Sequence, residues 1–257
     1  PITHFGRTRD VPLFGSFADE IIADLAPQWR NPKTPDQWRS TLQNDAAALL
    51  GLPVDAIETD DILKVLKPIW QEKHETARRL RGRIERILDA AAARGFRSEA
   101  NPARWKGHLK ELLPTKSKIE GAHFASLDYR DLPDFMARLA EREGLSAIAL
   151  TFLIHTAARS GEVRGAAWGE IDFKEAVWTI PAERMKAGRI HRVPLTPAAI
   201  AILKSVQIED EPSPSALVFP GAKGNPLSDM SLSAVLRRMR IPKGSATVHG
   251  FRSSFRD

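Results

Sequence analysis

The sequence contains no cysteine, and this absence limits the kinds of site that the protein can hold. Without thiols it has neither disulfides nor thiolate metal ligands. It also has no run of 18 or more apolar residues, the length that a membrane-spanning helix requires. Residues 1–10 lack the apolar core of a secretion signal. We therefore expect a protein that makes no membrane contact and that fits a reducing compartment.

Tyrosine and histidine are also scarce. Tyr129 is the only tyrosine among the 257 residues, and there are 7 histidines. None of the histidines shows the His-Glu-x-x-His spacing or another spacing typical of metal ligands. The sequence therefore predicts no metal site.

The sequence has an excess of basic charge. It holds 38 Lys and Arg against 32 Asp and Glu, which gives a net charge of +6 and a pI near 9.7. Such a balance favours a polyanionic partner such as nucleic acid, although many basic proteins bind none. Apolar residues make up 42% of the chain, enough for ordinary packed cores, and the length allows one large or two modest domains.

Residues 14–113 show the apolar periodicity of a helical domain, after a tail at 1–13 without periodicity. Pro, Gly and Asn residues divide this domain into helices. Ser16 is expected to cap the first helix, and Thr34 is expected to open a capping box at the start of the second. The five helices are predicted at about 16–29, 34–50, 59–68, 74–94 and 101–113.

The fourth of these helices is rich in arginine. Five arginines occur within residues 78–86, with only Glu85 to offset them. A solvated helix face is one interpretation, and a face that follows phosphate groups is the other. The later motifs favour the second. The predicted DNA-binding residues on this helix are Arg78, Arg79, Arg83 and Arg86.

Residues 114–122 are polar and without periodicity, so we predict a linker in which Lys116 and Lys118 lie along a DNA backbone. Residues 123–257 form the second predicted domain. Helices are expected at 132–140, 146–156, 161–167, 197–207 and 228–239, and short strands at 170–173, 177–180 and 192–195. The fold class is therefore mainly α with a small three-stranded antiparallel sheet (α+β).

Three ordered motifs in the second domain gather groups that bind and protonate a phosphate. They are Thr156-Ala157-Ala158-Arg159-Ser160-Gly161-Glu162, then Lys186 on the hairpin between the last two strands, then His249-Gly250-Phe251-Arg252 on one predicted helix face. Arginine grips phosphate oxygens with paired donors, whereas lysine and histidine can pass a proton near neutral pH. Phosphodiester exchange needs both the neutralised charge and the proton for the leaving oxygen.

These motifs, in this order, resemble those of the tyrosine recombinases, the phage-type integrases, with Ala157 where the family usually has glycine. The resemblance implies a helical core-binding domain and a catalytic domain with the DNA breaking-rejoining fold. It implies site-specific recombination, in which a tyrosine forms a 3′-phosphotyrosyl link and frees a 5′-hydroxyl. Arg159 and Arg252 would hold the nonbridging oxygens. His249 would assist proton transfer, Lys186 would be the acid, and Glu162 would orient Arg159.

The resemblance also implies the partners and the setting. These are double-stranded DNA, a tetramer of protomers on the DNA, a monomer when free, and the cytoplasm of a bacterial or phage-infected cell. No cofactor is expected, because the phosphotyrosyl link keeps the bond energy. The family's tyrosine follows the His-x-x-Arg segment, whereas Tyr129 precedes Arg159. We therefore expect residues 123–257 to be a C-terminally incomplete catalytic domain and the chain to bind DNA without cleaving it.

Several other interpretations compete with this one. Arg159 and Glu162 lie three residues apart and could form a structural ion pair. Lys186 could be a solvated hairpin lysine, with Lys223 as the competing candidate, and His249 could be a structural hydrogen-bonding residue. For the whole protein, the alternatives are a non-catalytic DNA-binding regulator derived from an integrase and a basic helical scaffold that binds RNA or protein.

Overall fold

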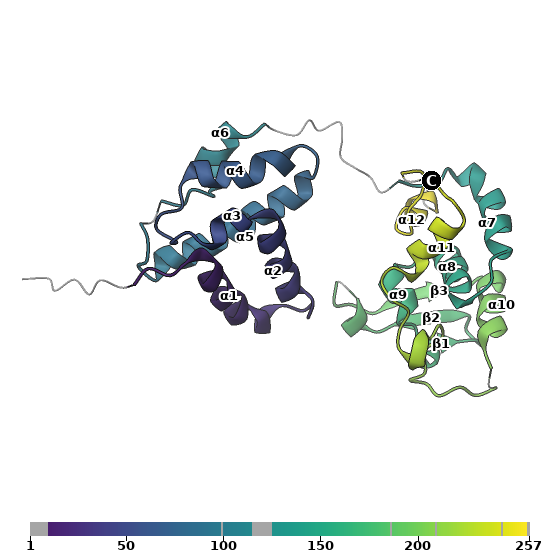
Figure 1. The fold of residues 1–257 in the computed structure, drawn as a ribbon. Coiled ribbons are helices and arrows are strands. Elements are labelled where there is room, and N and C mark those ends of the chain that lie inside the picture. The colour runs from purple at the N-terminus through teal and green to yellow at the C-terminus, as the bar shows by residue number, and fades with distance from the viewer. Residues whose placement is uncertain are drawn as a thin grey trace, which may run out of the picture. The chain divides into compact units, whose positions relative to one another are not determined.

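The computed structural model describes residues 10–98, 100–114, 125–185, 187–208, 210–242 and 244–255. The chain divides into two compact units, residues 1–120 and residues 121–257, each with its own hydrophobic core (Figure 1). Lys116, Lys118 and Lys186, three of the predicted site residues, lie outside the described ranges.

The first unit is helical. Its helices are α1 (Phe14–Leu25), α2 (Thr34–Asp45), α3 (Ala47–Leu50), α4 (Thr59–Trp70), α5 (His74–Ala93) and α6 (Lys110–Leu112). Helix α5 packs against α1, α2 and α4. It buries an apolar stripe that includes Leu80, Ile84 and Ile87, because residues three and four apart share one helix face. The arginines lie mostly on the opposite face, so the core leaves them available at the surface.

Three boundaries in this unit differ from the sequence prediction. Helix α1 begins at Phe14 and not at Ser16, whose hydroxyl instead donates to the Leu13 carbonyl at 3.0 Å. The second predicted helix is interrupted at Ala46, whose backbone leaves the helical region at φ −134° and ψ 26°. The expected helix at 101–113 is helical only near its end, because Gly107 adopts a left-handed φ of 71°.

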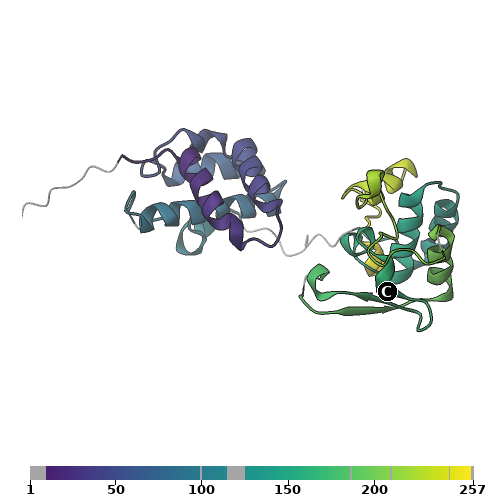
Figure 2. The same ribbon diagram turned by 90° about the horizontal axis from the view of Figure 1, so that it is seen from below.

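The second unit combines helices with one small sheet. Its helices are α7 (Leu132–Ala140), α8 (Leu145–Thr156), α9 (Ser160–Arg164), α10 (Pro197–Val206), α11 (Ser231–Arg238) and α12 (Phe251–Ser254). The strands are β1 (Ile171–Asp172), β2 (Val177–Ile180) and β3 (His191–Pro194), paired antiparallel in the order β1-β2-β3. In register, Trp178 of β2 faces Ile171 on one side and Val193 on the other. Figure 2 shows this sheet lying along one side of the helices.

Helix α8 is the centre of the second unit. It is apolar around most of its circumference and packs against α7, α9, α10 and α11. Its Phe152 ring lies 5.4 Å from Trp178 on the sheet and 5.5 Å from Phe219. Because α8 packs against four other helices, the residues at its C-terminal end are held in place.

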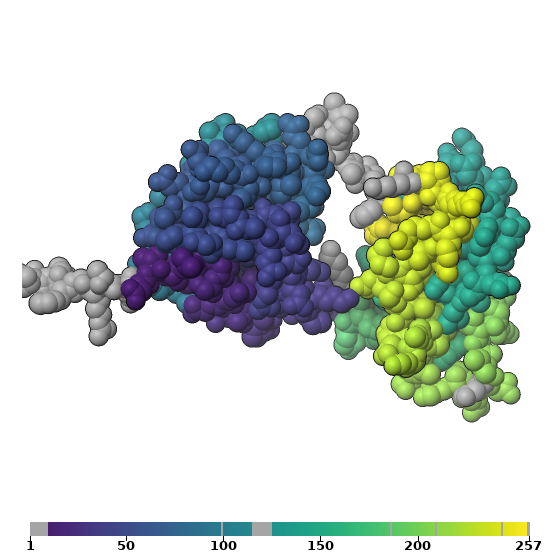
Figure 3. All heavy atoms as spheres, in the orientation of Figure 1, coloured from purple at the N-terminus to yellow at the C-terminus, as the bar shows by residue number. Residues whose placement is uncertain are grey.

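The predicted fold class, mainly helical with a small three-stranded antiparallel sheet, is confirmed. Figure 3 shows the yellow C-terminal segment at the surface of the second unit. Within the described ranges, no helix is both long enough and apolar enough to cross a membrane.

Candidate functional site

The turn between α8 and α9 presents Arg159. Ala157 ends α8 in the left-handed conformation, with φ 48°, which normally favours glycine. Arg159 is the residue immediately before α9, and its backbone is extended. The Arg159 side chain is 44% accessible, so this sharp turn exposes its guanidinium beside the first turn of a helix. Helix N-termini favour anions, so the position suits a phosphate.

Glu162 holds Arg159 in place. Its carboxylate is almost fully buried and accepts the Arg159 backbone N–H at 2.8 Å and Nη1 at 2.6 Å. One carboxylate therefore caps the helix and orients the guanidinium. The ion pair considered from the sequence is present, and it leaves a large part of the arginine exposed. Glu162 can therefore hold Arg159 in place while the exposed part of the Arg159 guanidinium binds an anion.

Arg252 reaches the same turn from the end of the chain. It lies half-buried on α12, and its Nη1 donates to the backbone carbonyl of Ala157. Ala157 is two residues before Arg159, so a contact across 95 residues of sequence joins the first and third motifs. The structure thus brings Arg159, Glu162 and Arg252 to one region of the second unit.

The sequence predicted His249 on the same helix face as Arg252, and this prediction is wrong. His249 is exposed and lies before α12, which begins at Phe251. It lies in the turn before α12, and its carbonyl accepts the Arg252 backbone N–H at 3.2 Å. The turn is fixed by close backbone packing. A Cβ at Gly250 would lie 2.0 Å from the Ala125 carbonyl oxygen, and the Thr247 hydroxyl accepts the Gly250 N–H at 2.9 Å. Any side chain at position 250 would therefore clash with the Ala125 backbone, and α12 begins only after this close contact, at Phe251.

Arg184, which the sequence analysis did not identify, also contacts this region. Its Nη1 pairs with the Glu170 carboxylate, and its Nη2 donates to the backbone carbonyl of Glu162. The only sequence signal is its position two residues before Lys186. The neighbouring Met185 is buried in the core.

In the first unit, the arginines of α5 occupy different environments. Arg78 and Arg79 both donate to the Glu75 carboxylate, at 3.1 and 2.8 Å. The hydrogen bond from Arg78, and after it the one from Arg79, hold the pKa of the Glu75 carboxyl below its usual value. Arg86 is exposed. Arg81 instead turns inward and bonds to Glu85 at 2.6 Å. The exposed members of the set are Arg78, Arg79 and Arg86.

Arg83 has a structural contact as well. Its guanidinium lies 5.5 Å from the Trp38 ring, and Nη1 donates to the Gln37 carbonyl at 2.8 Å. Burial, and secondly the charge of Arg79, lower the pKa of this guanidinium. Arg83 therefore links α5 to α2, in addition to any role on DNA.

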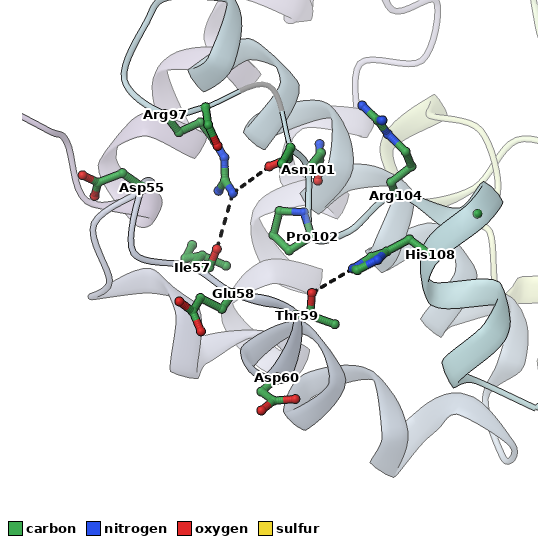
Figure 4. A pocket seen from close by; sticks show the side chains of 13 residues that line it. Asp55, Ile57, Glu58, Thr59, Asp60, Arg97, Asn101, Pro102, Arg104 and His108 are labelled. Atoms are coloured by element: carbon green, nitrogen blue, oxygen red, sulfur yellow. Dashed lines mark hydrogen bonds between the residues drawn. The ribbon is translucent and has the colours of Figure 1, made fainter.

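An open pocket of about 600 Å³ lies elsewhere in the first unit, at the start of α4 (Figure 4). Thr59 bonds to His108 across it at 2.8 Å. Acidic side chains such as Asp55 and Asp60 line it together with basic ones such as Arg97 and Arg104. This mixture gives the pocket no clear preference for a phosphate. Among the described residues, no cluster of three or more histidine or carboxylate side chains could hold a metal ion.

Comparison with known proteins gives consistent matches. Residues 14–108 match the phage integrase central domain, and residues 126–256 match the phage integrase family. The prophage integrase IntZ of Escherichia coli K12 is 34% identical over 246 residues, which cover 94% of this chain and 58% of that protein. The integrase of Enterobacteria phage P4 is 29% identical over 218 residues, which cover 78% of this chain and 48% of that protein. The chain thus spans about half the length of these relatives.

Solved structures share the fold. A lambda integrase tetramer bound to a Holliday junction has a TM-score of 0.71 at 17% identity, covering 97% of this chain and 77% of that one. The Tn1549 transposon integrase in complex with circular intermediate DNA has a TM-score of 0.65 at 14% identity, covering 93% and 85%. Likeness at such low identity establishes the fold alone. Since the family match spans residues 126–256, including all of the described site around Arg159, this chain belongs to the phage integrase family.

Proposed function

We propose that the protein is a site-specific DNA recombinase that exchanges phosphodiester bonds through a phosphotyrosyl intermediate. The contact that carries this proposal is the bond from Arg252 to the Ala157 carbonyl, which brings a second arginine to the turn that presents Arg159. Two guanidinium groups beside a helix start can neutralise the extra charge that a phosphodiester gains in its transition state.

Each proposed residue has a defined part in the exchange. A tyrosine hydroxyl attacks phosphorus, a tyrosine–phosphorus bond forms, and the bond from phosphorus to the 5′ oxygen breaks. Arg159 and Arg252 hold the nonbridging oxygens, and Glu162 keeps Arg159 oriented. His249 assists removal of the tyrosine proton, and Lys186 gives a proton to the leaving 5′ oxygen. The phosphotyrosyl link keeps the bond energy for religation, so the reaction needs no nucleotide cofactor.

Tyr129 is not the proposed nucleophile. It precedes α7, its side chain is 53% exposed, and the Arg130 guanidinium lies 5.3 Å from its ring. Tyr129 is therefore assigned a structural or DNA-adjacent role, and the nucleophile is sought after the His249–Arg252 motif, where the family pattern places it.

The proposed partner is double-stranded DNA. We assign residues 14–113 as the core-binding domain, residues 114–122 as the linker and residues 123–257 as the catalytic domain. The exposed arginines of α5 would contact phosphates, as would Lys116 and Lys118. By analogy with the lambda integrase tetramer on a Holliday junction, protomers would assemble as tetramers on DNA. We further propose that the free protein is a monomer in the bacterial cytoplasm.

A nicked-duplex substrate tests the proposed function. Such a substrate loses its short 5′-hydroxyl fragment after cleavage, so religation fails and the covalent adduct accumulates. The protein expressed from its gene should give an adduct that Arg159→Ala abolishes and Tyr129→Phe leaves unchanged. DNA binding without an adduct would support the alternative, a non-catalytic DNA-binding regulator. An adduct that Tyr129→Phe removes would refute the assignment of Tyr129.

A further inference from the structure

Arg184 joins two elements that are separate in sequence. It ends the short helical turn Ala182–Arg184, which follows β2. Its side chain is 24% accessible, and its two terminal nitrogens bond in different directions. Nη1 pairs with the carboxylate of Glu170, and Nη2 donates to the backbone carbonyl of Glu162 on α9. The guanidinium therefore bridges the base of the β2–β3 hairpin and the helix that follows Arg159.

The surroundings are built to receive this guanidinium. A Cβ at Gly165 would lie 2.9 Å from Nη2 of Arg184 and 3.3 Å from Cζ, so a larger residue here would push the guanidinium out of its present position. The Glu170 carboxylate also accepts the indole N–H of Trp178 at 2.9 Å. Trp178 is fully buried on β2, so the acidic partner of Arg184 is itself fixed to the sheet.

We propose that Arg184 is a positioning residue for Lys186: it fastens the start of the lysine-bearing loop to α9, and thereby to the site of Arg159. This inference rests on the proposed recombinase function. Arg184 stands two residues before Lys186, and Met185 between them is 7% exposed in the core. Both residues leading into the lysine are therefore anchored on the second unit.

A direct contact with DNA explains Arg184 less well. Most of its side chain is covered, and two of its nitrogens already have protein acceptors. The flat guanidinium can bond two acceptors that lie in different directions, whereas a lysine ammonium on a flexible stem holds such a pair poorly. Arg184→Lys therefore keeps the charge but loses the bridge.

The bridge should affect one chemical step more than the other. Arg159 is held by the Glu162 carboxylate, which Arg184 does not touch, since Arg184 bonds to the backbone carbonyl of that residue. Loss of Arg184 should thus displace the proton donor and leave the phosphate-binding arginine in place. A 5′-bridging sulfur tests this, because a thiolate, with a pKa near 8.5 for a simple thiol, departs without the proton that an alkoxide needs.

The experiment compares cleavage of two nicked duplexes, one with oxygen and one with sulfur at the 5′-bridging position, by the protein expressed from its gene. On the oxygen substrate, Arg184→Lys should cleave about 10- to 100-fold more slowly, with unchanged Kd for DNA. On the sulfur substrate it should cleave near the parent rate, as Lys186→Ala should. Arg159→Lys should stay slow on both substrates.

Two further variants make the comparison specific. Arg138→Lys is the control: Arg138 is an exposed arginine of this unit that also donates to a backbone carbonyl, that of Met239 at 2.9 Å, and among the described residues it has no hydrogen bond to α9. It should cleave both substrates at the parent rate. Gly165→Ala crowds the Arg184 guanidinium without removing it. Like Arg184→Lys, it should cleave the oxygen substrate slowly and the sulfur substrate near the parent rate. It keeps the inference testable if Arg184→Lys fails to fold.

Parent-like cleavage of the oxygen substrate by both Arg184→Lys and Gly165→Ala would overturn the inference. So would a folded variant whose defect persists on the sulfur substrate. These outcomes differ from failure of the proposed function, in which the parent protein itself forms no adduct with either substrate.

Discussion

At the scale of the residue, the site depends on backbone conformation as much as on side chains. Ala157 holds a left-handed φ of 48° at the end of α8, and its carbonyl receives Arg252. An alanine in this region is strained because its Cβ approaches the backbone. The same residue therefore turns the chain towards Arg159 and supplies the acceptor that places the second arginine.

Ala157→Gly should relieve this strain. We expect the free energy of unfolding to rise by about 0.5–1 kcal/mol, the steric relief less the entropy that glycine adds to the unfolded chain. Urea denaturation measures it. Ala201, exposed inside α10, is the matched control, and Ala201→Gly should instead lower the free energy of unfolding by about 1 kcal/mol. A loss of stability in both variants would show that Ala157 is unstrained.

At the scale of the element, the arginine helix divides into surface and structural members. Arg86 is exposed, whereas Arg83 packs on Trp38 and bonds to the Gln37 carbonyl. The sequence grouped these arginines by helical spacing, which fixes the face but not the contacts of long side chains. Only the packing of α2 against α5 separates the two environments.

Arg86→Ala and Arg83→Ala should therefore differ. Arg86→Ala should weaken DNA binding to a similar extent for all sequences and reduce the salt slope by about 1, without changing the free energy of unfolding. Arg83→Ala should also lower the free energy of unfolding, by about 1–2 kcal/mol, through the lost ring contact and hydrogen bond. Fluorescence anisotropy at several salt concentrations, with urea denaturation, measures both. An unchanged salt slope for Arg86→Ala would remove this face from the DNA interface.

At the scale of the whole molecule, basic charge is distributed over both units. The net charge is +6, and cationic residues occur on α5 as well as around Arg159. A protein that neutralises several phosphates releases several counterions, so its affinity falls steeply with salt.

We accordingly expect the chain of residues 1–257 to bind duplex DNA with a steep salt dependence. The slope of log affinity against log salt should be about −0.9 for each phosphate contacted. Titrations of one labelled duplex at a series of salt concentrations measure it, with a neutral polymer as competitor for comparison. A flat slope, or effective competition by the neutral polymer, would contradict an electrostatic DNA interface.

The sequence by itself determined the fold class, the position of α7 and β2, and the order of the motifs around Arg159. These follow from local patterns, since apolar period, proline and glycine act within a few residues of the chain. Spacing alone also indicated the pairing of Arg159 with Glu162, because both lie within one helical turn.

Only the tertiary structure decided which distant groups meet. The bond from Arg252 to Ala157 spans 95 residues, and that from Arg184 to the Glu162 carbonyl spans 22. His249 was expected on a helix, but Gly250 must pass within contact of Ala125, more than a hundred residues earlier, and that approach delays the helix. Such contacts depend on how whole elements pack, and no local period in the sequence encodes them.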